Sequence, residues 1–124
     1  MFDKILVLEK LEQIDEALGR IERRFTKIDS SDDFLDSDEG LDMLDGIAMM
    51  LIAIGESFKK IDMETDGALL AQYPGIPWPG VKGVRDILSH HYFNIDAEEI
   101  FRICTDDLKP LKEVVQQMIK EFKK

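Results

Sequence analysis

The chain has 124 residues, the usual size of a single domain, so we expect one domain over residues 1–124. It is 44% hydrophobic and 34% charged, which is typical of a globular protein. The longest apolar run, Ile47–Ile54, is far shorter than the ~20 residues of a transmembrane helix, so we expect no membrane span. The N-terminal stretch does not read as a signal peptide and there is a single cysteine, so we expect a cytoplasmic protein without an internal disulfide.

The net charge of −10 argues at first sight against nucleic acid as a partner, but this charge is unevenly distributed. Residues 29–45, which we call the acidic block, hold most of the excess. They contain eight acidic residues and no basic one: Asp29, Asp32, Asp33, Asp36, Asp38, Glu39, Asp42 and Asp45. The block is interpreted as a solvated loop and helix start, or as a docking surface for a basic partner.

The first predicted element is a long helix over residues 2–28. Its apolar residues alternate in steps of four and three, which marks one face of a helix. They are Val7, Leu11, Ile14, Leu18, Ile21, Phe25 and Ile28. The same spacing suits a coiled coil, but the acidic break that follows favours packing within a bundle.

The stretch "DSSDDFLDSDEG" is rich in Ser, Asp and Gly, so we expect a loop there. A second helix should begin near Ser37 or Asp38, both good capping residues, and run to about Ile61. It carries two apolar stripes, which predicts a central helix buried from several sides. The first stripe is Ile47, Leu51, Ile54, Phe58 and Ile61, and the second is Leu41, Leu44, Ala48 and Ile52.

Prolines and glycines then interrupt the pattern over residues 63–80. We expect a third helix from Trp78 or Pro79 to Tyr92, and a short helix capped by Asp96 that ends near Ile103. Asp106 and Asp107 should open a last helix with Pro110 in its first turn or at a kink. No strand pattern is found, so the sequence predicts an all-α, up-and-down bundle of four to five helices.

The motif "RDILSHHY", residues 85–92, holds both histidines of the chain. On a helix of 100° per residue, His91 falls on the apolar face, whereas His90 lies outside it and is free to act. Ser89 and Tyr92 fall beside Arg85. Because Arg85 and His90 are about 140° apart, one straight helix does not bring them together. Either the helix loosens before His90, or a second copy of the chain completes the site.

Histidine exchanges protons near neutral pH, and arginine holds a phosphate with a charged, two-pronged fork. Together they suffice to cleave RNA without metal: the 2′-hydroxyl attacks the neighbouring phosphorus, histidine moves a proton, and arginine stabilises the phosphoryl oxygens. The competing interpretation is structural, with Arg, His and Tyr satisfying carbonyls and acidic neighbours at a helix end. Adjacent histidines do not suit a metal site, and a thiol nucleophile at Cys104 has no further support.

The motif resembles the HepT-like branch of the HEPN superfamily, small all-helical proteins paired with MNT-type nucleotidyltransferases. Four further segments are similar to that family: "AIGESFKKI" with Glu56, "YPGIPW", "HYFNIDAEEIF" and "DLKPLKEVV". The resemblance implies a HEPN-like fold and a homodimer, or higher oligomer, with its sites at the subunit interface. It implies metal-independent RNA cleavage, with tRNA among the substrates, and no cofactor.

Carried over by position, Arg85 and His90 match the catalytic pair. Tyr92 matches the tyrosine that the partner nucleotidyltransferase modifies with AMP. Ser89, His91 and Glu56 are expected in supporting positions. One departure is Asp86, where the family usually has a small polar amide; its carboxylate could neutralise Arg85 or raise the pKa of His90.

Three functions follow from these observations. The first is the RNase toxin of a type VII-like toxin–antitoxin module, silenced by AMPylation of Tyr92. The second is a non-catalytic partner or regulatory subunit of a nucleotidyltransferase. The third is a helical dimerisation module with another nucleotide or nucleic-acid role.

Overall fold

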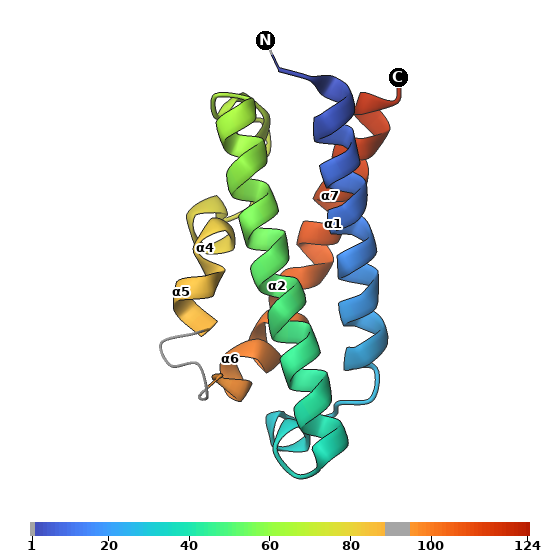
Figure 1. Cartoon of the computed structure of the whole chain (residues 1–124), viewed down its shortest axis with the longest axis vertical. Helices are drawn as coiled ribbons and strands as arrows, with labels where there is room; N and C mark the ends of the chain where they lie inside the picture. Colours follow the sequence, from blue (N-terminus) through green and yellow to red (C-terminus); the bar gives the residue numbers. More distant parts are fainter. Residues whose placement is uncertain (1, 89–94) are drawn as a thin grey trace.

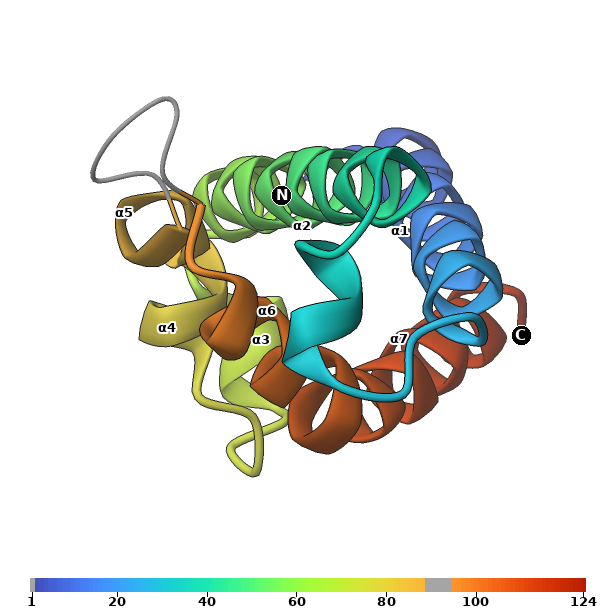
Figure 2. The ribbon, with the colours of Figure 1, turned by 90° about the horizontal axis from the view of Figure 1, so that it is seen from below.

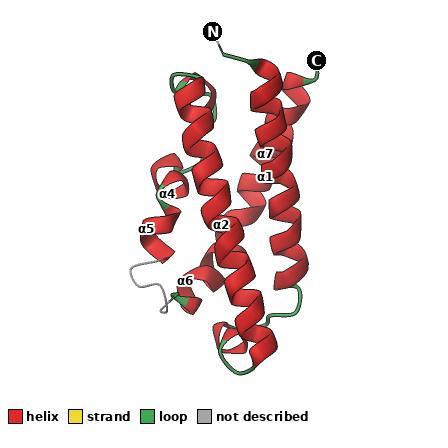
Figure 3. Ribbon diagram, viewed as in Figure 1, coloured by secondary structure: helices red, strands yellow, loops and turns green. Residues whose placement is uncertain are grey.

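Three long helices run side by side along the molecule: α1 (Lys4–Phe25), α2 (Asp38–Glu64) and α7 (Leu108–Phe122) (Figure 1). The structure, a computed structural model, describes residues 2–88 and 95–124. Within these ranges every regular element is a helix (Figure 3). Successive elements alternate in direction, from α1 to α2, then to the short helices α4 and α5, then to α7. The predicted all-α bundle is confirmed.

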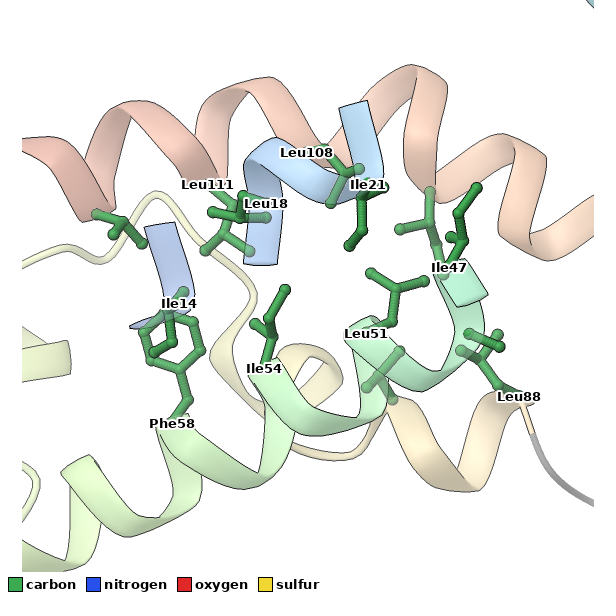
Figure 4. Close-up of a cluster of buried hydrophobic side chains, with 14 of the residues drawn as sticks. Ile14, Leu18, Ile21, Ile47, Leu51, Ile54, Phe58, Leu88, Leu108 and Leu111 are labelled. Carbon is green, nitrogen blue, oxygen red and sulfur yellow. The ribbon is translucent and has the colours of Figure 1, made fainter. Parts of the chain in front are cut away.

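Helix α1 forms where the four-three spacing predicts it, but it is shorter than the predicted helix at both ends. The Asp3 carboxylate caps its start by accepting from the backbone N–H groups of Ile5 at 3.0 Å and Leu6 at 3.3 Å. The stripe is almost completely buried from Val7 to Ile21. Figure 4 shows Ile14, Leu18 and Ile21 from this stripe facing the core side chains of α2 and α7.

The loop expected over residues 29–40 is wrong for Ser31–Phe34, which form a 3₁₀ helix, η1. The Asp33 carboxylate accepts from the backbone N–H groups of Asp29 at 2.7 Å and Ser30 at 3.2 Å, which closes this turn. Phe34 is fully buried, and the segment packs against α2 and α6 at one end of the bundle (Figure 2). One aromatic residue within the acidic block therefore anchors it to the core.

Helix α2 begins at the predicted cap, where the Ser37 hydroxyl accepts from the Gly40 N–H at 2.9 Å. Its first apolar stripe, Ile47 to Ile61, is buried, whereas the second is buried only in part because Leu41 is 40% exposed. A turn through Asp66 and Gly67, both with positive φ, leads into α3 (Ala68–Ala71), which buries Leu69 and Leu70. The sequence interpretation missed α3 because a single helical turn shows no periodicity.

The single helix expected from Trp78 to Tyr92 is divided. Its described part forms α4 (Trp78–Lys82) and α5 (Val84–Leu88), which are separated at Gly83. Glycine has a low helix propensity, and the Gly83 N–H closes the last turn of α4 on the Pro79 carbonyl at 3.0 Å. The part of this prediction beyond Leu88 lies outside the described residues until Ile95.

The last two predicted helices are one continuous helical stretch. The Asp96 carboxylate caps α6 (Ala97–Arg102) by accepting from the Glu99 N–H at 3.0 Å, as predicted. The chain then continues through a π-helical turn, η2 (Ile103–Asp107), into α7. The expected new start at Asp106 and Asp107 is therefore wrong, and Asp107 makes no side-chain capping bond. Pro110 does lie in the first turn of α7, directly after the π turn.

A glycine of α2 determines how closely α4 and α5 approach the bundle. A Cβ atom at Gly55 would lie 2.8 Å from the Val81 carbonyl oxygen and 2.9 Å from Val84 Cγ1. Both distances are too short for any carbon side chain. Gly55 therefore allows the end of α4 and the start of α5 to rest directly on the backbone of α2, a contact that we call the Gly55 seat.

The segment before α4 is tied to two long helices. The Tyr73 hydroxyl donates to the Glu121 carboxylate of α7 at 2.8 Å. The Trp78 indole N–H donates to the Tyr73 carbonyl at 2.9 Å, and its ring lies 5.0 Å from that of Phe58 in α2. Burial, with the Glu121 hydrogen bond and charge, raises the pKa of Tyr73 to about 12.

We expect Gly55→Ala to lower the free energy of unfolding by roughly 1–3 kcal/mol, because the added methyl group overpacks the Gly55 seat. The matched control is Gly19→Ala in α1, where a Cβ atom meets nothing within 4 Å. That variant should gain up to about 1 kcal/mol from helix propensity alone. Urea unfolding followed by circular dichroism measures both. A Gly55→Ala protein as stable as Gly19→Ala would contradict the close approach.

Stability should fall in alkaline solution partly through Tyr73. The unfolded chain releases the tyrosine proton near pH 10, whereas the folded chain holds it to about pH 12. The contribution of Tyr73 to the free energy of unfolding is therefore fully present below pH 10 and is lost as the pH rises toward 12. The difference in unfolding free energy between the wild type and Tyr73→Phe should be constant from pH 7 to 9 and shrink above pH 10. A difference in unfolding free energy that stays constant to pH 11.5 would contradict the raised pKa of Tyr73.

Candidate functional site

Helix α5 presents the arginine of the motif. Val84 and Leu88 are buried on its inner side, whereas Arg85 and Asp86 are exposed on its outer side. Ser89, His90, His91 and Tyr92 lie outside the described residues, so the predicted pairing of Arg85 with His90 stays a prediction.

Two interactions besides the Gly55 seat hold the helices that lead to Arg85. The Lys82 ammonium at the end of α4 pairs with the Asp62 carboxylate of α2 at 2.7 Å, and both side chains are mostly shielded from solvent. Trp78 at the start of α4 is 7% exposed. The two ends of α4 are therefore fixed on α2, and α5 continues from a fixed position.

Sequence reasoning missed these positioning residues. Lys82 and Asp62 are 20 residues apart, and nothing in the local pattern pairs them. A signal did exist for Gly55, because an isolated glycine within an apolar helical stripe often marks a close backbone approach. The hydrogen-bond partner of the Trp78 indole could not be predicted from the sequence, because the acceptor is a backbone carbonyl.

Glu56 follows Gly55 on α2, so it lies one residue from the contact with α4 and α5. Its carboxylate pairs with the Lys59 ammonium at 3.2 Å, one turn along the same helix. Both side chains are about two-fifths exposed. Such a pair contributes little to stability, which leaves Glu56 able to exchange partners at the surface beside α5.

The thiol alternative is disfavoured by the surroundings of Cys104. This residue lies in the π turn and is partly buried among apolar side chains. Burial raises the pKa of Cys104 to about 12, so the thiol keeps its proton at neutral pH. Among the described residues, no cluster of three or more His, Cys, Asp or Glu side chains has the arrangement of a metal site.

In the two described ranges, none of the helices combines the length and the apolar character needed to cross a bilayer. The charged side chains are instead distributed along the outer faces of the long helices. Pairs such as Lys10–Glu64 and Lys123–Glu12 connect neighbouring helices there.

Comparison with known proteins shows that the sequence of this chain is similar to those of ribonucleases. The chain is 32% identical over 102 residues to the "Probable ribonuclease HepT" of Thermococcus cleftensis, which covers 82% of this chain and 86% of that protein. It is 33% identical over 72 residues to "Putative RNase MJ0127" of Methanocaldococcus jannaschii and 29% identical over 76 residues to "Putative RNase MJ1216" of the same organism. The matches cover 55% and 61% of this chain, and the chain spans only 56% and 60% of the length of those two proteins.

No solved structure gives a significant match. The family model described as "Ribonuclease HepT-like" matches residues 14–118, which is most of the chain. That span runs from the first helix through α7 and contains the whole motif of residues 85–92. On this evidence, the chain belongs to the ribonuclease HepT-like family of the HEPN superfamily.

Proposed function

We propose that the chain is a metal-independent ribonuclease that acts as a homodimer and as the toxin of a type VII-like toxin–antitoxin module. The observation that carries this proposal is the family match over residues 14–118, which includes the complete motif from Arg85 to Tyr92. The exposed position of Arg85 on α5 supports it, because a phosphate-binding guanidinium must be reachable from solvent.

In the proposed reaction, the 2′-hydroxyl of a ribose attacks the adjacent phosphorus and the bond to the 5′-oxygen breaks. His90 transfers the proton that this exchange requires, and Arg85 stabilises the negative charge on the phosphoryl oxygens. The products are a 2′,3′-cyclic phosphate and a 5′-hydroxyl end. The substrate is RNA, with tRNA as the first candidate.

The motif geometry motivates the homodimer. His90 falls about 140° from Arg85 on an ideal helix, so a second subunit is the simplest source of the missing partner for each residue. Two copies of α5 facing each other would bring Arg85 of one subunit toward His90 of the other.

AMPylation of Tyr92 by a cognate MNT-type nucleotidyltransferase is the proposed means of control. The tyrosine oxygen attacks the α-phosphorus of ATP and pyrophosphate leaves. The new phosphodiester would lie near Arg85 on the same motif, where it would occupy the positive charge that RNA needs.

A second candidate is a non-catalytic partner subunit of the nucleotidyltransferase. The observation that favours it is Asp86, whose exposed carboxylate directly follows Arg85 on α5. A negative charge at this place opposes phosphate binding. An Asp86→Asn variant that cleaves RNA, beside a wild type that does not, would favour this second function.

Arg85→Ala and His90→Ala should each lower the rate of tRNA cleavage by roughly 100-fold or more, since each removes a group that acts in the transition state. Cleavage by the wild type should be unchanged by a chelator. His91→Ala is the matched control and should stay near the wild-type rate. Wild-type cleavage by His90→Ala would rule out the assignment of the proton shuttle.

Mixing the two inactive chains tests the shared site. If each site takes Arg85 from one subunit and His90 from the other, a dimer of one Arg85→Ala chain and one His90→Ala chain contains one intact site. Partial activity should then return after subunit exchange. A mixture that stays inactive, although mass spectrometry shows mixed dimers, would place both residues in the same subunit.

Coexpression with a nucleotidyltransferase from a neighbouring gene should increase the intact mass of the chain by whole AMP units and stop RNA cleavage. The Tyr92→Phe chain should keep its mass and its cleavage rate, because it lacks the acceptor oxygen. An AMP adduct found on Tyr73, the other tyrosine of the chain, would contradict the proposed control.

A further inference from the structure

A cavity lies on the side of α4 and α5 that faces the rest of the bundle. Its volume is about 320 Å³, and it is enclosed by α2, by α4 with the loop before it, and by the continuous stretch from α6 to α7. Leu51 and Ile54 of α2 and Val81 of α4 give it an apolar floor. This volume is near the lower end for ligand-binding pockets, enough for one or two side chains.

All the charged residues that line this cavity come from one wall. Glu99, Arg102, Asp106 and Asp107 follow one another in steps of three, four and one, so they share one face of the helical stretch that includes the π turn. Three acids and one base leave a formal charge of −2 at the rim, within a chain of net charge −10.

Arg102, the one cation among the described residues that line the cavity, is already engaged. The Arg102 guanidinium lies 2.7 Å from the Glu99 carboxylate and 3.2 Å from that of Asp107. Within the part of the chain that the structure describes, the Asp106 side chain makes no hydrogen bond or ion pair, and it is exposed. The cavity therefore combines an apolar floor with one unpaired carboxylate at its edge.

The apolar floor and the acidic rim of the cavity favour one kind of ligand. A phosphate would be repelled by the acidic rim, so the RNA backbone is disfavoured. Arginine and lysine have an apolar stem that packs along hydrophobic surface and a cationic head that stays near water. Their shape and charge match the floor and Asp106.

We propose that this cavity, the α4–α7 pocket, is a docking site for a basic segment of a partner protein, whose arginine or lysine stem lies on the apolar floor while its cationic head pairs with Asp106. The pocket is separate from the proposed nuclease motif: Val84 lines the pocket, whereas Arg85 is exposed on the other side of α5. The proposal does not depend on RNA cleavage.

The test uses the full chain and two blocked tripeptides, Leu-Arg-Leu and Leu-Glu-Leu, followed by ¹H–¹⁵N NMR. Leu-Arg-Leu should shift the backbone amides of Gly80, Val81 and Asp106, and Leu-Glu-Leu should not. Asp106→Asn should weaken binding of Leu-Arg-Leu about two- to fivefold, as expected for loss of an exposed ion pair.

Gly80→Leu provides a variant that fills the pocket. Gly80 lines the cavity, and a Cβ atom there meets nothing within 4 Å, so the new side chain adds volume without a clash at its first carbon. The Gly80→Leu substitution should abolish the amide shifts that Leu-Arg-Leu causes. Gly19→Leu on α1 is the matched control and should bind as the wild type does; well-dispersed spectra of both variants show that they are folded.

Four results would overturn the proposal. Shifts confined to the acidic block and unaffected by Gly80→Leu would mean that the peptide binds only by general charge attraction. Equal binding of Leu-Glu-Leu, or tighter binding of cytidine or guanosine monophosphate at the pocket amides, would assign an apolar or a nucleobase site instead. Butylguanidinium that binds as tightly as the peptide would point to a free small cation. Each result is measured without RNA cleavage, so it leaves the nuclease proposal untouched.

Discussion

The position of the candidate site depends on the Gly55 seat, a contact between the backbone of α2 and the α4–α5 junction. A glycine within a helix costs about 1 kcal/mol relative to alanine. Here it permits an approach that no other residue allows, because a Cβ atom would lie 2.8 Å from a carbonyl oxygen. With Val84 held against α2, the two residues that follow it on α5 face outward. The exposure of Arg85 and Asp86 is thus set by a residue 30 positions earlier in the chain.

The two sides of the α4–α5 junction face different surroundings. The outer side carries Arg85, the cation expected to meet a phosphate, and beside it the carboxylate of Asp86. The inner side borders the α4–α7 pocket, whose charged wall is mainly acidic. In the two proposals, RNA binds at one face of this junction and the partner segment binds at the other. The 3₁₀ helix of the acidic block lies at one end of the bundle, where Phe34 anchors it to the core (Figure 2).

The sequence was informative where a pattern extends over several turns. The stripe of α1 and the first stripe of α2 predicted most of the core residues on those helices, and the caps at Ser37 and Asp96 were found at the expected positions. Short or non-local features could not be predicted. The 3₁₀ helix η1 and α3 are each about one turn long, and the Lys82–Asp62 pair joins distant positions. For the site, the roles of Arg85, Ser89, His90, His91 and Tyr92 remain proposals, because the last four lie outside the described residues.

The most direct test of this account measures the Gly55 seat itself. Nuclear Overhauser effects between the α protons of Gly55 and the methyl groups of Val84 depend steeply on distance. The account predicts strong cross-peaks in the wild-type chain, since the built Cβ position lies 2.9 Å from Val84 Cγ1. If both residues are assigned and these cross-peaks are absent, then α5 does not rest on α2 at this point, and the orientation derived for Arg85 is wrong.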